Sequence, residues 1–351
     1  MKKSALFLFC IAFHSFYSQE DTVKVGLQLS PEKQAEEFYN QGIVALKALD
    51  LPGAEELFSK SLQLRPDFEK ALNNRAIVYT QQKKYDQGVR DLNHSLLLNN
   101  ANSDTWFNKS LLYFNLNLRD SQEVALDRCL RLNPDHAEAA YHKGVLLFDT
   151  RDYDKSINYF GIAIASDRRN AYAYNDRGSA RREKGDYAAA ISDYEKALIL
   201  DSSLAFIHNN IGSCYRISKN YSKALQAYDA ALRIDPSYLT AMLNRGVAYL
   251  ENNNIRAARQ DFEKVLSTDP KNSFAYNNLA SIAIREKDYT EAKRLSTQAL
   301  ELDEKNGAAY YNRGIARQML REEQGCCSDW KKARELGVVA AKAFIYASCT
   351  E

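Results

Sequence analysis

The sequence repeats itself every 34 residues, and this period constrains the fold more than any other feature. Four prolines follow apolar stretches and lie 68, 102 and 34 residues apart, all multiples of 34: Pro66, Pro134, Pro236 and Pro270. Counting from Ala35, nine repeats follow one another without insertion or deletion: 35–68, 69–102, 103–136, 137–170, 171–204, 205–238, 239–272, 273–306 and 307–340. A fixed period of this length is typical of arrays in which each repeat stacks on its neighbours.

Three positions within the repeat indicate how each repeat folds. Position 8 is Gly, Ala or Ser in all nine repeats, and position 20 is small in eight. Position 24 is large in eight repeats, the exception being Ser296: Phe58, Leu92, Leu126, Phe160, Tyr194, Tyr228, Phe262 and Trp330. Small residues let two helices pack closely, and a large residue fills the space beside them. Each repeat is therefore predicted to form helix A, a short polar turn and helix B.

These residues resemble the tetratricopeptide repeat, whose pattern has a large residue at position 4, Tyr at 11 and Pro at 32. Trp106 matches position 4, and position 11 is matched by Tyr79, Tyr113, Tyr215 and Tyr249. The resemblance covers residues 35–338 and implies an all-α fold, a right-handed α-α superhelix (tetratricopeptide solenoid) of nine helix-turn-helix repeats. Ser30 and Pro31 are suited to a helix N-terminus. Residues 19–34 are thus expected to lead into the first helix, and 341–351 to form a capping helix and tail.

The N-terminus has the features of a secretory signal peptide, with a buried N-terminal helix as the alternative. Lys2 and Lys3 precede a mostly apolar run, residues 5–13, that is too short to span a bilayer. We expect residues 1–18 to be removed on export to the periplasm or cell exterior, with no transmembrane segment after cleavage. Five cysteines would remain, an odd number at irregular spacing, which argues against a disulfide framework. Cys326, at position 20, is expected to pack in the core.

Position 7 is Arg in four repeats, and the same four have Asp at position 23. The pairs are Arg75 with Asp91, Arg177 with Asp193, Arg245 with Asp261, and Arg313 with Asp329. No repeat has the Asp without the Arg, so we expect the two side chains to meet across helices A and B through paired hydrogen bonds. We interpret them as structural ion pairs, since a catalytic or ligand-binding site is rarely copied four times along an array.

Position 6 is Asn in seven of nine repeats: Asn40, Asn74, Asn108, Asn210, Asn244, Asn278 and Asn312. Asn is a poor helix former, so its recurrence within helix A needs a cause. The row is similar to the asparagine ladder in the superhelix of O-linked N-acetylglucosamine transferases. That resemblance implies that the row faces a concave groove, where its amides can bind the backbone of an extended peptide. The alternative is that these residues only hydrogen-bond to the neighbouring repeat.

Aromatic residues flank the asparagine row and offer a second set of contacts for a peptide. They are Tyr39, Phe107, Tyr141 and Tyr311 at position 5, and Tyr172, Phe206 and Phe274 at position 2. Such rings could anchor apolar side chains of a ligand, as at binding hot spots, or pack between repeats.

Composition and motifs limit the classes of function that the chain can have. The chain has 47 basic and 45 acidic residues, without the basic excess of a nucleic-acid binder. We find no phosphate-binding loop, catalytic motif or metal-ligand spacing. The sequence therefore predicts a non-catalytic protein–protein interaction module without cofactor or metal, an exported adaptor or assembly factor that binds an extended segment of a partner protein. The alternatives are a structural scaffold that self-associates through its convex face or caps and, more remotely, an enzyme with a site in the groove.

Overall fold

The structure is a computed structural model that describes residues 29–349, over which every regular element is an α-helix. The helices are α1 (Pro31–Lys47), α2 (Leu51–Leu64), α3 (Glu69–Gln81), α4 (Tyr85–Leu98), α5 (Ser103–Asn115), α6 (Arg119–Leu132), α7 (Ala137–Asp149), α8 (Tyr153–Ser166), α9 (Ala171–Glu183), α10 (Tyr187–Leu200), α11 (Ala205–Ile217), α12 (Tyr221–Ile234), α13 (Leu239–Glu251), α14 (Ile255–Thr268), α15 (Ser273–Arg285), α16 (Tyr289–Leu302), α17 (Gly307–Met319), α18 (Glu323–Glu335) and α19 (Ala341–Ser348). The predicted leader, residues 1–18, lies outside the described residues.

Each predicted repeat coincides with one pair of helices, and the turn between them has the same geometry throughout. Position 15 has a positive φ in every turn, although it is Gly only at Gly185. In repeat seven, the backbone N–H of Asn254 donates to the carbonyl of Tyr249, which closes the end of α13. The side chain of Asn254 then accepts from the backbone N–H of Ala257 and caps α14. The chain therefore reverses within three residues in each repeat, which aligns helix B against helix A.

The core lies between helices A and B, where the ring at position 24 covers the residue at position 8. A Cβ atom added to Gly246 would lie 2.6 Å from the ring of Phe262, and one added to Gly144 would lie 2.7 Å from Phe160. Both rings are fully buried. The two helix backbones approach so closely that no side chain fits beneath the ring.

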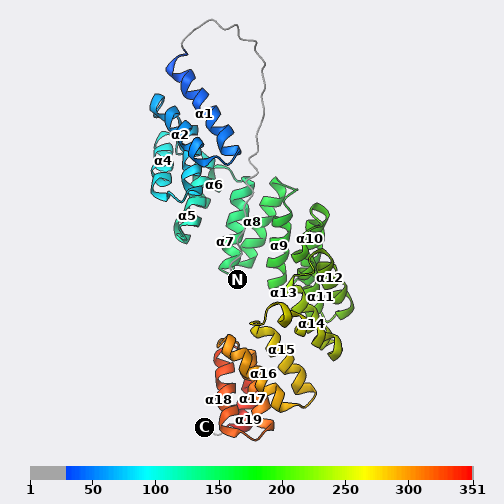
Figure 1. Cartoon of the computed structure of the whole chain (residues 1–351). Coiled ribbons are helices and arrows are strands. Elements are labelled where there is room, and N and C mark those ends of the chain that lie inside the picture. Colours follow the sequence, from blue (N-terminus) through cyan, green and yellow to red (C-terminus); the bar gives the residue numbers. More distant parts are fainter. Residues whose placement is uncertain (1–28, 350–351) are drawn as a thin grey trace. The chain divides into compact units, whose positions relative to one another are not determined.

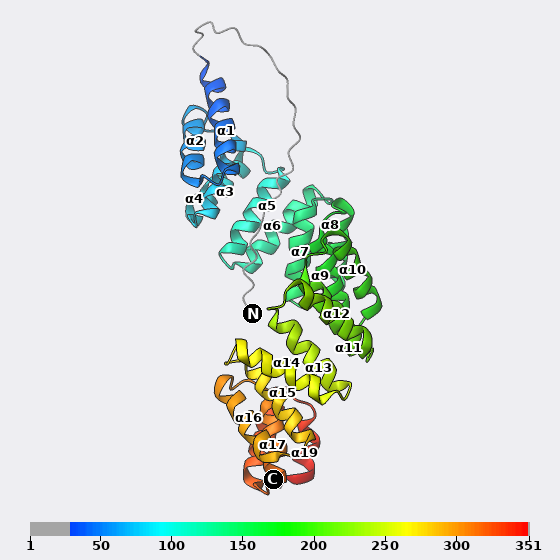
Figure 2. The ribbon, with the colours of Figure 1, turned by 45° about the vertical axis from the view of Figure 1, so that its right-hand side comes forward.

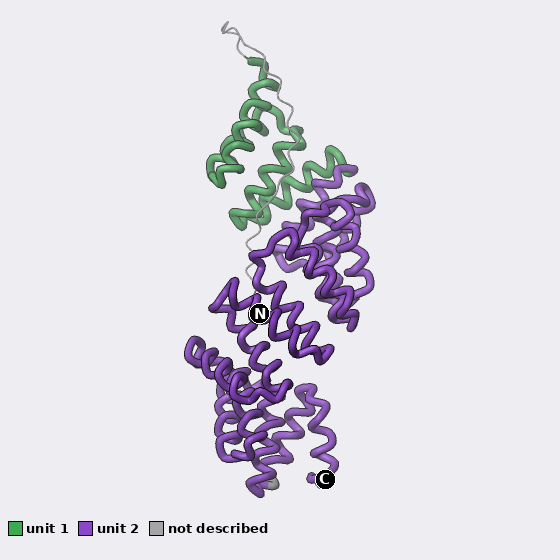
Figure 3. Tube along the Cα trace, turned by 90° about the vertical axis from the view of Figure 1, so that its right-hand side faces the viewer, with its two compact units in different colours: residues 1–100 green, residues 101–351 purple. Residues whose placement is uncertain are grey.

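The helices form two compact units, which divide after Asn100 (Figure 3). In the first unit each helix from α1 to α4 packs on the next. In the second unit the same order continues from α5 to α19, and helices A of consecutive repeats also contact one another, as α13 contacts α15 (Figures 1 and 2). Each unit is thus an α-helical solenoid. Within the described part of the chain, no helix is both long and apolar enough to cross a membrane.

The last repeat is covered by α19, which packs on α18. The ring of Phe344 in α19 lies 5.0 Å from that of Trp330, so the short helix covers an aromatic core. Cys327 and Cys349 form a disulfide that joins α18 to the end of α19. The expectation that the cysteines form no disulfide was therefore wrong for this pair. The other three described cysteines are buried, as expected for Cys326. The odd number of cysteines therefore did not predict whether Cys327 and Cys349, which are only partly buried, would pair.

Candidate functional site

The structure brings together all four predicted Arg–Asp pairs. Arg245 donates from Nε and Nη2 to the two oxygens of Asp261, at 2.9 and 2.7 Å. The other three pairs have the same bidentate geometry, with distances of 2.7–2.9 Å. All four aspartates are buried, and Asp193 is fully so. Hydrogen bonds to Asp261 raise the pKa of Arg245 although burial opposes the shift. These contacts join helix A to helix B within a repeat.

Two of the pairs have a second arginine that the sequence analysis did not identify. Arg181 donates to Asp193 and Arg317 donates to Asp329, both at 2.8 Å. Both lie at position 11, where the other two Arg–Asp repeats have Tyr79 and Tyr249. The replacement of Tyr by Arg at this position was the signal that could have revealed them.

The asparagines at position 6 are bonded to the preceding repeat. Asn244 donates to the side-chain oxygen of Asn209 at 2.9 Å, Asn210 donates to Asn175 at 3.1 Å, and Asn312 donates to Asn277 at 2.8 Å. Asn74 donates to the Tyr39 hydroxyl at 3.3 Å. The acceptor is always the residue at position 5, 35 residues earlier. The alternative interpretation, hydrogen bonding to a neighbouring repeat, thus describes these four residues.

These bonds do not use every hydrogen-bonding group of the row. A carboxamide has two N–H donors and one acceptor oxygen, and Asn244 uses one donor in its hydrogen bond to Asn209. Asn278 makes no side-chain hydrogen bond within the described residues, because position 5 of the preceding repeat is Leu243. Asn312 is the least available, since it is only 8% exposed and also donates to Ser281. Asn40 is exposed, and Asn108 is half-buried.

The four aromatic residues at position 5 pack between repeats. Tyr39 is half-buried and packs against Phe68 of its own repeat and the cluster that includes Ala71 and Leu72 of the next repeat. Phe107 contacts His136 and His142, and Tyr311 contacts Phe344 in α19. Tyr141 donates its hydroxyl proton to Asp176 at 2.7 Å, and burial followed by the charge of Asp176 raises its pKa. Packing is therefore the structural role of this set.

The aromatic residues at position 2 are more accessible. Tyr172 is 55% exposed and Phe274 is 61% exposed. Tyr172 also stacks on Phe206 of the next repeat, with ring centroids 6.4 Å apart. Large rings that remain accessible are better candidates for contact with a partner than the buried set. Within the residues that the structure describes, no group of three His, Cys, Asp or Glu side chains could hold a metal ion.

Comparisons with known proteins agree with this architecture. Sequence profiles described as the tetratricopeptide repeat match residues 205–238 and residues 110–160, 146–205 and 243–293. A tetratricopeptide repeat protein from Parabacteroides merdae is similar in structure, with a TM-score of 0.63 and 18% identity over 71% of this chain and 99% of that chain. Yeast Tom70 has a TM-score of 0.52 and 16% identity over 90% of this chain and 82% of its own. Pseudomonas aeruginosa pilF has a TM-score of 0.54 and 13% identity over 60% and 96%. No curated protein matches the chain. At these identities the similarity concerns the fold alone.

Proposed function

Because the chain belongs to the tetratricopeptide repeat family, a family of protein-interaction modules, we propose that it binds an extended segment of a partner protein along the position 6 asparagines. In this proposal the protein is non-catalytic and acts outside the cytoplasm as an adaptor or assembly factor. The observation that carries the proposal is the ordered row of amides, each at the same place on helix A.

The inter-repeat bonds support peptide binding because they orient the amides. Asn210 donates to Asn175 and accepts from Arg182, whereas Asn244 is held by one hydrogen bond to Asn209, which leaves the acceptor oxygen of Asn244 for a ligand. Packed helices lie about 8–10 Å apart and an extended chain advances about 3.3 Å per residue, so one amide would serve about every third peptide residue. Tyr172 and Phe274 add accessible apolar surface at position 2.

Two features support export. Residues 1–18 have the composition of a signal peptide, and disulfides such as Cys327–Cys349 form and persist in oxidising compartments. Mass spectrometry of the mature chain after cell fractionation tests this part of the proposal. A mature chain that retains residues 1–18 in the cytoplasmic fraction would contradict it.

Asn278 offers the cleanest test of the binding row, because it has no bond within the array that its removal would break. A partner is first captured from periplasmic and membrane fractions, purified and titrated against the protein. Asn278→Ala is expected to weaken binding about fivefold with an unchanged melting temperature, since one hydrogen bond contributes about 1 kcal/mol. The triple variant Asn210→Ala, Asn244→Ala and Asn278→Ala should lose binding almost completely.

A matched control separates lost contacts from lost folding. Asn312→Ala removes buried hydrogen bonds to Asn277 and Ser281, so it is expected to lower stability more than Asn278→Ala. A triple variant that binds the purified partner as tightly as the unchanged protein would rule out the asparagine row. Light scattering over a concentration series would show instead whether the protein acts by self-association.

A further inference from the structure

Repeats five and nine share a set of residues that is absent from the other Arg–Asp repeats. In repeat nine the set comprises Tyr310, Arg313, Arg317, Ser328, Asp329 and Lys332, at positions 4, 7, 11, 22, 23 and 26. Repeat five has the same six residue types at the same positions, among them Arg177, Arg181 and Asp193. The set joins helix A to helix B of one repeat, whereas the position 6 asparagines bond to the preceding helix A.

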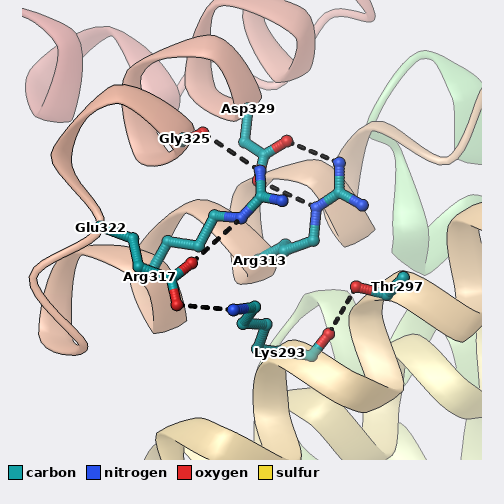
Figure 4. Close-up of polar contacts among 7 residues, drawn as sticks. All are labelled: Lys293, Thr297, Arg313, Arg317, Glu322, Gly325 and Asp329. Carbon is teal, nitrogen blue, oxygen red and sulfur yellow. Dashed lines mark hydrogen bonds and ion pairs between the residues drawn. The ribbon is translucent and has the colours of Figure 1, made fainter.

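Around Asp329 in repeat nine, positive charges outnumber negative ones (Figure 4). Arg313 and Arg317 both donate to Asp329, which is only 2% exposed. Arg317 also lies 3.7 Å from Glu322, but that carboxylate pairs with Lys293 at 2.5 Å. Three cations thus share two carboxylates. Because the two guanidinium groups are largely withdrawn from solvent, water screens this excess charge only in part.

In other repeats, the cation at position 7 donates to an acceptor at position 25 of the preceding helix B. The equivalent donor in repeat nine is Nη1 of Arg313. In repeat seven the acceptor is Asp229, which accepts from Nη1 of Arg245 at 2.7 Å. In repeat four the acceptor is Asp127, which accepts from Lys143 at the same distance.

In repeat nine this position is Thr297, whose hydroxyl donates to the carbonyl oxygen of Lys293 at 2.8 Å (Figure 4). Within the described residues, Nη1 of Arg313 has no acceptor.

Arg313 also lines a pocket of about 400 Å³, whose wall is formed by the repeat nine set together with Lys331 and Glu335. Its volume is within the usual range for ligand sites. Lys332 pairs with Glu335 at 3.2 Å, and Lys331 adds a further cation to the wall. The pocket therefore combines a concave surface, excess positive charge and an unshared guanidinium edge.

We propose that this pocket binds an acidic side chain from an Asp- or Glu-rich segment of another polypeptide. The carboxylate accepts from Nη1 of Arg313, in the place that Asp229 takes beside Arg245. A carboxylate is the expected ligand because the chain itself puts one at the equivalent place in repeats four and seven. Arg–carboxylate hydrogen bonds are short and charge-assisted, and Lys331 supplies longer-range attraction. This site is separate from the asparagine row and does not depend on it.

The most informative variant adds a carboxylate to the site and leaves its arginines unchanged. Thr297→Asp is expected to place a carboxylate beside Arg313, as Asp229 does beside Arg245, and so to block an external one. The probe is a fluorescein-labelled Glu/Ser peptide, measured by fluorescence anisotropy with the full chain, and its control is the corresponding Gln/Ser peptide. The Glu peptide should bind and the Gln peptide should not. Thr297→Asp should weaken binding at least about tenfold, the effect of one charge-assisted hydrogen bond, without lowering the melting temperature.

A second variant and a control complete the test. Arg317→Tyr converts repeat nine to the pattern of repeats two and seven, removes the excess charge and should also weaken binding at least about fivefold. Ser267→Asp makes the same charge change as Thr297→Asp at an exposed position of α14 and should leave binding within about twofold.

Equal binding of the Glu and Gln peptides, or full binding by Thr297→Asp, would overturn the proposal. Binding of inorganic phosphate without binding of the Glu peptide would overturn the assignment to a carboxylate. Asn278→Ala should leave Glu-peptide binding unchanged, so failure of this site and failure of the asparagine row are distinguishable.

Discussion

At the residue scale, the size of the side chain at position 8 follows that of the residue opposite it at position 24. The six repeats with a ring at position 24 all have Gly at position 8, and a Cβ atom there would lie 2.4–2.9 Å from the ring. The three repeats without a ring have Ala76 opposite Leu92, Ser110 opposite Leu126, and Ala280 opposite Ser296. The two helices thus approach each other to the limit that their contact residues allow.

This match predicts the effect of Gly246→Ala. Ala favours the helix by about 1 kcal/mol, but its methyl group would overlap the ring of Phe262, so we expect a net destabilisation of about 1–3 kcal/mol. Adding Phe262→Leu recreates the combination of Ala76 and Leu92 and should recover part of that loss. Urea unfolding followed by circular dichroism measures both variants. A neutral or stabilising Gly246→Ala would show that the helices can move apart freely.

A buried histidine makes stability depend on pH. Burial, together with the charge of His136, lowers the pKa of His142 to about 4, below its usual value near 6.5. The unfolded chain therefore binds a proton more readily than the folded chain between these values. The contribution of His142 to stability should be fully present above pH 6.5 and fall by up to about 3 kcal/mol as the pH approaches 4.

The measurement compares thermal unfolding of the unchanged protein and His142→Gln from pH 7 to pH 4. The variant should lose less stability over this range. His94→Gln, which changes an exposed histidine, is the control and should follow the unchanged protein. Identical pH profiles for all three proteins would contradict the assignment to His142.

At the element scale, the buried aspartates hold helix B to helix A. Asp261 receives two hydrogen bonds from Arg245, which has a second carboxylate partner in Asp229. Asp193 is the shared partner of Arg177 and Arg181. The cost of removing an aspartate should therefore depend on how many cations lose their partner.

Asp193→Ala is expected to cost about 3–5 kcal/mol, since it leaves two partly buried arginines without that carboxylate. Asp261→Ala should cost less, because Arg245 retains Asp229. The double variant Arg245→Leu and Asp261→Leu should recover most of the Asp261→Ala loss. Denaturation in a double-mutant cycle measures the coupling. A double variant no better than the sum of the single ones would mean that the pair contributes no coupling energy.

At the scale of the whole molecule, contacts in the described chain join helices that are near one another in sequence. In such arrays, stability is approximately a sum over repeats and the interfaces between neighbours. The last repeat has a neighbour on one side and only the short α19 on the other, with the Cys327–Cys349 disulfide holding that helix. Local opening should therefore begin there once the disulfide is lost.

Trp330 lies in the core of this repeat and can report its opening. With Trp106→Phe as the background, Trp330 is the remaining tryptophan. We expect Cys349→Ser to move the fluorescence transition of Trp330 to a lower urea concentration than the loss of helix by circular dichroism. The background protein with its disulfide intact is the control. Coincident transitions in Cys349→Ser would indicate that the array unfolds as one cooperative unit.

Much of the fold could be predicted because the contacts that define each helix pair lie within a single 34-residue repeat. The helix pairs coincide with the repeats since each turn and each A–B contact lies within 34 residues. The Arg–Asp pairs were also predictable, because Arg at position 7 and Asp at position 23 occur together in the same repeats. The position 5 partners of the asparagines could not be predicted, since that contact spans 35 residues and depends on how successive repeats stack.

The sequence by itself determined the repeat, its two helices and the residues that face each other within it, because the chain between them is short and regular. Only the tertiary structure decided which side chains of neighbouring repeats meet. It showed Thr297 at the place beside Arg313 where Asp229 lies beside Arg245, and Cys349 folded back onto Cys327. These contacts depend on the angle and rise from one repeat to the next. That geometry is determined by the packing of all the side chains at the interface between repeats.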